Sequence, residues 1–198
     1  SRAMNFYVTE MGNKGHYLDV VLRFHHIDTN FKMFDENGKK IRGDMHNVGI
    51  SLSSEYGRKK MIDDKGWYIE PQGQLTIGYL GGDNYTTSNG IAVRQGGIRS
   101  ALGRIGFNLG KDIDEKTNIY LKANLLHEFG GGYHAAMADN SGSRIKIDRS
   151  FKDTWCEYGI GAAIQTGTNN HVYLDFERSA GGDFKKDWSW NVGARWTF

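Results

Sequence analysis

The feature that most constrains this chain is an apolar–polar alternation with a period of two residues, which runs along most of its length. Between Trp67 and Tyr79, the odd positions carry mainly large apolar side chains, and the even positions carry polar or small ones. Two residues is the period of a β-strand, whose side chains point alternately to its two faces. The segment therefore predicts a strand that meets a different solvent on each face.

The same alternation recurs in eight further segments, which are residues 4–8, 17–25, 47–56, 100–109, 119–129, 157–165, 172–177 and 188–198. No segment of sufficient length shows the period of about 3.6 residues that an amphipathic helix requires. We therefore expect an all-β chain of about nine antiparallel strands, the first of them incomplete.

The connections between these segments alternate in length. Short turns are expected at 12–15, 60–66, 111–117 and 167–170, and longer loops at 27–46, 81–95, 130–153 and 181–187. Strict alternation places all short turns at one end of the sheet. This arrangement is typical of outer-membrane barrels, which have short periplasmic turns and longer extracellular loops.

Composition is compatible with such a barrel although the mean hydropathy is only −0.58. No stretch approaches the roughly 18 to 20 apolar residues that a membrane-spanning helix needs, whereas a barrel strand is apolar at every second residue only. The net charge of +2 gives no sign of nucleic-acid binding. The single cysteine excludes a disulfide framework and a Cys-based zinc cluster.

A soluble β-sandwich is the main structural alternative, because it also has one dry and one wet face per sheet. Two features favour a membrane barrel. Aromatic residues gather near the strand ends, as in the girdles that barrels place at the lipid headgroups. The strands are also longer than the usual five or six residues. Pro71 lies inside one of them and removes a ladder hydrogen bond, so we expect a bulge or a lapse in pairing there.

The C-terminal residues 191–198 resemble the sorting signal that the bacterial barrel assembly machinery reads. The positions that carry the resemblance are Asn191, Gly193, Trp196 and the terminal Phe198. An alternating last strand with a free edge can pair with the edge of another barrel. The resemblance thus implies that this segment binds the assembly machinery.

A larger part of the chain resembles the translocator barrel of autotransporters, the type V secretion family. The resemblance rests on residues 66–75, 100–107, 126–131 and the last strand, in that order. It implies an outer-membrane protein without catalysis or cofactor, which contacts membrane lipid, passes its own linker through the lumen and delivers an N-terminal passenger to the cell surface.

The family barrel has twelve strands, so residues 1–198 would form a partial translocator domain that contains the last nine or so. We therefore expect an N-terminally truncated chain. The sequence leaves open whether this chain closes into a barrel. Such a fragment would be a substrate or an assembly intermediate of the barrel assembly machinery.

Charged residues on the polar face are candidates for lumen ion pairs that hold the linker. The best candidates are Glu70, Arg104, Glu128 and Arg195, since the first three fall in the family-like segments. The alternative is that a barrel interior is polar only because water fills it. Which acid meets which base is left open by the sequence.

A small barrel hydrolase that acts on protein or lipid is the alternative function. Such an enzyme needs a histidine within hydrogen-bond reach of an acid or a serine. His25, His26 and His46 flank one long loop, whereas the alternation sends His127 and Glu128 to opposite faces. Loop histidines without a chemical role are the simpler interpretation, and we expect no metal site.

Overall fold

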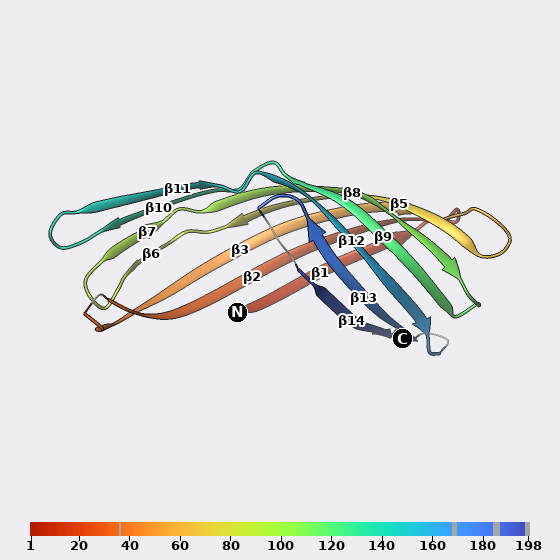
Figure 1. Cartoon of the computed structure of the whole chain (residues 1–198), viewed down its shortest axis with the longest axis horizontal. Helices are drawn as coiled ribbons and strands as arrows, with labels where there is room; N and C mark the ends of the chain where they lie inside the picture. Colours follow the sequence, from red (N-terminus) through yellow and green to blue (C-terminus); the bar gives the residue numbers. More distant parts are fainter. Residues whose placement is uncertain (36, 168–169, 184–186, 197–198) are drawn as a thin grey trace.

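The computed structural model describes residues 1–35, 37–167, 170–183 and 187–196, without the side chains of His171, Arg195 and Trp196. The described chain consists of β-strands that form two antiparallel sheets (Figure 1). Among the described residues, no helix is long and apolar enough to cross a membrane. The all-β antiparallel class predicted from the alternation is confirmed.

The main sheet is a curled meander in which each strand pairs with its sequence neighbour along the path (Figure 1). Along this path its strands, in spatial order, are β1 (Arg2–Met11), β2 (His16–Phe34), β3 (Lys40–Arg58), β5 (Trp67–Leu80), β8 (Ile98–Asp112), β9 (Thr117–Glu128), β12 (Asp153–Gln165), β13 (Asn170–Ala180) and β14 (Ser189–Trp196). A tenth strand, the two-residue β4 (Lys60–Met61), lies off the path and pairs with β5. Within the described residues, β1 and β14 are the two edges of this half-barrel.

All nine predicted strands are present, but several are longer than predicted. The expected loop at 27–46 is wrong, because β2 and β3 continue through it and pair as far as Phe34 and Lys40. The alternation persists here, with Ile27 and Phe31 on one face and Asp28 on the other. A tight turn closes this long hairpin, where the Asp35 carboxylate accepts hydrogen bonds from two backbone amides.

A second, four-stranded sheet replaces two more of the expected loops. Its strands are β6 (Asp83–Thr86), β7 (Ala92–Gln95), β10 (Gly132–Ala138) and β11 (Arg144–Ser150), in the order β11-β10-β7-β6. The predicted loops at 81–95 and 130–153 were therefore wrong, because segments of four to seven residues are too short to show a convincing period. Figure 1 shows this sheet beside the extended ends of β2 and β3.

Glycine pairs mark three of the four places where the chain passes between the main sheet and the second one. They are Gly81–Gly82 after β5, Gly96–Gly97 before β8 and Gly130–Gly131 after β9. Gly131 has a φ of 81°, which side chains rarely adopt, and a Cβ on Gly82 would lie 2.0 Å from the carbonyl oxygen of Gln95. At Gly82 and Gly131 the chain therefore changes sheets where a side chain would not fit, whereas the fourth junction, between β11 and β12, carries Phe151 and Lys152.

Pro71 lies at a lapse in pairing, as predicted. Strand β5 pairs with β3 up to the contact of Gln72 with Gly57, and it pairs again with the short β4 (Lys60–Met61) from Ile69 onward. Between these contacts the ladder on this side is interrupted at Pro71. The missing N–H of proline therefore leaves no broken hydrogen bond in that ladder.

The two faces of the main sheet differ as the alternation predicts. Large apolar side chains such as Leu75, Ile105 and Leu121 are more than half exposed on one face. We call this the apolar face, and the opposite one the polar face. Turns 12–15 and 113–116 lie at one end of the sheet, the short-turn end, and the β2–β3 turn and the second sheet lie at the other end, the long-hairpin end.

Candidate functional site

The polar face encloses a cavity of about 390 Å³. Six successive strands contribute its lining, which consists of Glu55, Gln72, Gln74, Arg104, Asn108, Tyr120, Lys122, Asn124, Leu126, Glu157, Asp175 and Glu177. Since six neighbouring strands line one cavity, the polar face is the concave side of the curled sheet and the apolar face is the convex side. Every charged residue of the lining was placed on the polar face by the alternation.

Arg104 is the centre of one network in this cavity. Its guanidinium contacts the Glu55 carboxylate at 2.7 Å and donates hydrogen bonds to the side-chain oxygens of Gln74 at 2.8 Å and Asn124 at 3.1 Å. The side chains of Arg104 and Glu55 are only 17% and 21% exposed. The structure thus places the predicted Arg104 in an ion pair and identifies Glu55 as its partner.

Lys122 is the centre of a second network. Its ammonium lies 3.0 Å from the Asp175 carboxylate and also contacts Glu177. The Tyr120 hydroxyl donates a further hydrogen bond of 2.7 Å to Asp175. Sequence reasoning put these charges on the correct face but did not select them, because their contact depends on how β9, β12 and β13 are aligned.

Glu70 and Glu128 lie on the polar face as predicted, but the ion pairs found in the described part of the chain include neither. Glu70 accepts hydrogen bonds from Gln72 at 2.7 Å and Asn108 at 3.3 Å. The buried Glu128 carboxylate accepts the backbone amides of Ala101 and Gly130, both at 2.8 Å. Glu128 therefore orders the backbone at the end of β9.

Only some of the predicted sorting residues in the C-terminal strand belong to the part of the chain that the structure describes. Asn191 pairs with Asp175 and Gly193 with Tyr173, whose ring lies so close that a Cβ on Gly193 would be 2.1 Å from it. The backbone of β14 is described through position 196, whereas the side chains of Arg195 and Trp196 and the whole of Phe198 lie outside the description.

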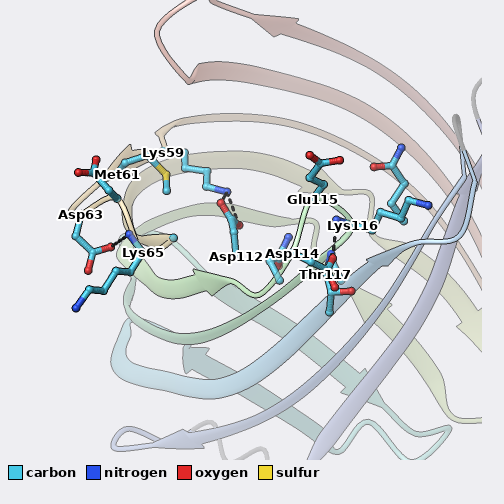
Figure 2. A pocket seen from close by; sticks show the side chains of 14 residues that line it. Lys59, Met61, Asp63, Lys65, Asp112, Asp114, Glu115, Lys116 and Thr117 are labelled. Atoms are coloured by element: carbon cyan, nitrogen blue, oxygen red, sulfur yellow. Dashed lines mark hydrogen bonds and ion pairs between the residues drawn. The ribbon is translucent and has the colours of Figure 1, made fainter.

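The short-turn end opens into a hollow of about 780 Å³ (Figure 2). Lys59 points across it to Asp112, with its ammonium 2.8 and 2.9 Å from the two carboxylate oxygens, and lies 4.0 Å from the centre of the Tyr68 ring. In the next turn, the Asp114 carboxylate accepts hydrogen bonds from the backbone amides of Lys116 and Thr117. These bonds, the one from Lys116 above all, lower the pKa of the Asp114 carboxyl group. Sequence reasoning did not single out these turn residues.

The histidines of the long hairpin lie on both faces of the sheet. His26 and His46 contact the same carboxylate oxygen of Asp28 at 3.0 and 2.8 Å, and all three side chains are substantially exposed, whereas His25 lies on the polar face. The His46 contact lowers the pKa of Asp28, and the Asp28 contact raises the pKa of His46. Among the described residues, no three histidine, cysteine or acidic side chains are placed to hold a metal ion.

His127 and Glu128 point to opposite faces, as the alternation predicts. The His127 imidazole contacts the hydroxyl of Thr154 at 2.6 Å, while the Glu128 carboxylate turns to Ser100 on the polar face. The two neighbours therefore do not form an acid–base pair.

Comparison with known proteins gives consistent matches. Residues 1–177 match the family model described as autotransporter beta-domain. The chain is 32% identical over 196 residues to the pertactin autotransporter of Bordetella parapertussis and 26% identical over 196 residues to the BrkA autotransporter of Bordetella pertussis, which covers 97% of this chain in each case. It covers 21% and 19% of those proteins, so it spans about a fifth of their length.

A solved structure supports the same assignment. The beta domain of the Bordetella autotransporter BrkA matches with a TM-score of 0.74 and 25% identity, over 99% of this chain and 72% of that one. Together with the family match, the apolar convex face and the charged concave face identify the kind of wall that a membrane barrel presents to lipid and to its lumen. The chain belongs to the autotransporter beta-domain family, whose β-barrels lie in the outer membrane.

Proposed function

We propose that residues 1–198 form part of a translocator barrel that carries an N-terminal passenger to the cell surface and anchors it there. The observation that supports this most directly is the charged cavity of the polar face, in which Arg104 and Lys122 each connect several strands. By analogy with barrels of this kind, the short-turn end is periplasmic and the long-hairpin end is extracellular.

The polar lining suits passage of a polypeptide linker. The amide side chains of Gln72, Gln74 and Asn124 and the carboxylates around them offer hydrogen-bond donors and acceptors to a passing backbone. The lining holds two cations, Arg104 and Lys122, against the carboxylates of Glu55, Glu157, Asp175 and Glu177, so carboxylates outnumber cations by two. The wall is therefore acidic, and a neutral or basic linker suits it better than an acidic one.

This proposal is tested by narrowing the cavity in the natural full-length protein. Asn124→Trp adds a large ring beside Arg104, whereas the control Leu125→Trp adds the same ring to the apolar face of the same strand. We expect surface display of the passenger, measured by protease shaving of intact cells, to fall only for Asn124→Trp. Equal display by both variants, with equal amounts of folded barrel, would contradict passage through this cavity.

We also propose that residues 191–198 bind the barrel assembly machinery. The support is that β14 is an edge of the described sheet, which leaves one side of its backbone for pairing. Trp196→Asp or deletion of Phe198 should block insertion into the outer membrane, whereas Ser189→Thr at the start of the strand should not. Normal insertion of both the Trp196→Asp variant and the chain without Phe198, judged by membrane fractionation, would refute this proposal.

We infer that the domain has no catalytic activity of its own. The His26–Asp28–His46 group is the arrangement nearest to a hydrolase site, but it is exposed on the convex side instead of lying in a cleft. Assays of the purified chain on lipid and peptide substrates should give no turnover. Hydrolysis that disappears in His25→Ala or His46→Ala would instead favour the hydrolase alternative.

A further inference from the structure

The second sheet has an inner and an outer face. On one face the Tyr85 ring contacts Phe31 of β2, with ring centres 5.9 Å apart, and Val93 and Ala135 are buried. Phe31 and Asp19 are an even number of residues apart on β2, so their side chains lie on the same face of the strand. Asp19 pairs with Glu55, whose side chain lies on the concave side. The face with Tyr85 therefore continues the lumen side, and the opposite face continues the lipid-facing side.

Three cations gather on this outer face around a floor of alanines. Arg94, Ala136 and Lys146 lie in one row across three strands, and the next row is Ala92, Ala138 and Arg144. These residues line a hollow of about 270 Å³. Because neighbouring strands are about 4.8 Å apart, the backbones of Arg94 and Lys146 are separated by roughly 10 Å across Ala136. Their long side chains can therefore converge on an anion between them.

The cations have no acidic partner within the described residues. Arg94, Arg144 and Lys146 take part in none of the ion pairs found there, and all three are exposed. The carboxylate that these four strands place on the same face is that of Asp148, which is bonded to His134 at 2.5 Å. The face thus carries a positive charge that an external anion would neutralise.

The cluster lies above the lipid-facing wall. Arg99 and Tyr79 pair at the upper edge of the apolar face, next to a hollow of about 660 Å³ that Leu22, Ile50 and Ile77 help to line. Arg94 is five residues further along the chain, which corresponds to about 12 Å along the membrane normal for a strand tilted by roughly 45°. A phospholipid carries its phosphate at the membrane boundary, whereas a sugar-extended headgroup can carry phosphate at the height of Arg94.

We propose that Arg94, Arg144 and Lys146 bind the phosphate groups of a phosphorylated glycolipid in the outer leaflet. Guanidinium groups bind phosphate through paired hydrogen bonds, and the alanine floor leaves room for a sugar ring between them. The outer face of the second sheet continues the apolar face of the main sheet. The acyl chains would therefore lie on the barrel wall while the headgroup lies on the second sheet. This inference requires the outer-membrane location but does not depend on passenger transport.

The test uses the chain folded in neutral detergent and titrated with purified lipopolysaccharide. The triple variant Arg94→Gln, Arg144→Gln, Lys146→Gln should bind about tenfold more weakly, because it loses three exposed charge contacts. The control Arg149→Gln, Lys14→Gln, Lys65→Gln removes the same charge from exposed sites outside the cluster and should bind within about twofold of the original chain, with Arg149 on the opposite face of β11. Folding of each variant is checked by the mobility of unheated samples in gels.

Further arms separate the sources of phosphate. Chemically dephosphorylated lipopolysaccharide should bind the original chain and the triple variant equally weakly, and millimolar inorganic phosphate should not displace the intact lipid. Unchanged affinity of the triple variant, equal loss in the control, tight binding of the dephosphorylated lipid or full displacement by free phosphate would each overturn the proposal. If the triple variant does not fold, the single variant Lys146→Gln replaces it, with an expected loss of about twofold to threefold.

Discussion

Arg104 shows how one residue can fix the polar face. Its guanidinium contacts Glu55 on β3, Gln74 on β5 and Asn124 on β9, so it connects three strands besides its own. A charge that is mostly removed from water is stabilised only while its partners remain. Loss of one partner should therefore cost more than the ion pair itself contributes.

Glu55→Gln should lower the free energy of unfolding by about 1–3 kcal/mol, since the Arg104 charge is left without its counter-ion. Arg23→Gln is the matched control, because Arg23 donates a hydrogen bond to a side-chain oxygen of Asn5 at an exposed site, so its loss should cost below about 0.5 kcal/mol. Urea unfolding in micelles measures both values. In the double variant with Arg104→Gln, strict additivity of the two losses would contradict direct coupling.

The contact between His46 and Asp28 should make the long hairpin sensitive to pH. The raised pKa of His46 means that its stabilising contribution is present at low pH and is lost as pH rises through that pKa, whereas the lowered pKa of Asp28 means that its own contribution is lost as pH falls through that value. The hairpin should thus be most stable between the two. Hydrogen exchange of residues 26–46 as a function of pH measures this window.

Asp28→Asn should bring the pKa of His46 down towards that of a free histidine, as followed by NMR titration. The control Asp44→Asn should have a smaller effect, because Asp44 acts on His46 only through its charge and without a hydrogen bond. A pKa of His46 that is the same with and without the Asp28 carboxylate would exclude the contact.

At the scale of the element, the alternation was sufficient to predict nine of the ten strands of the main sheet, all but the two-residue β4, and the face of every charge in the cavity. It failed where strands are short, as in β6 and β7 with four residues each. Such strands are stabilised by partners far away in sequence, and no local period reports those partners. The pairing of Lys122 with Asp175 was missed for the same reason, because it depends on register across β12.

The glycine pairs at the junction of the two sheets give an element-scale prediction. Gly82→Ala should loosen the second sheet, because the new Cβ would collide with a backbone oxygen that cannot rotate away. Gly73→Ala on β5 is the control, since no atom lies within 4 Å of its Cβ position. Proteolysis of residues 83–150 in the folded chain should become faster only for Gly82→Ala. Unchanged protection of both variants would show that the junction tolerates side chains.

At the scale of the whole molecule, the described chain is a wall without a conventional core. Few side chains are buried, and its large apolar residues are exposed along the convex face from β1 to β14. In water such a surface would drive aggregation. In the outer membrane, we expect lipid to cover it, so that the membrane supplies the apolar environment that a soluble protein builds from its own side chains.

A charge added to the apolar face should therefore destabilise the folded protein in a membrane, whereas the same charge added to the polar face should be tolerated. Ile105 lies midway along β8 on the apolar face and is 64% exposed, so Ile105→Lys would place an ammonium near the bilayer midplane at a cost of about 2–4 kcal/mol. Gln72→Lys places the same group on the polar face beside the Glu70 carboxylate, which already accepts a hydrogen bond from Gln72. Folding into lipid vesicles, measured by urea titration, should be impaired for Ile105→Lys only. If Gln72→Lys were the more destabilising change, the assignment of lipid to the convex side would be reversed.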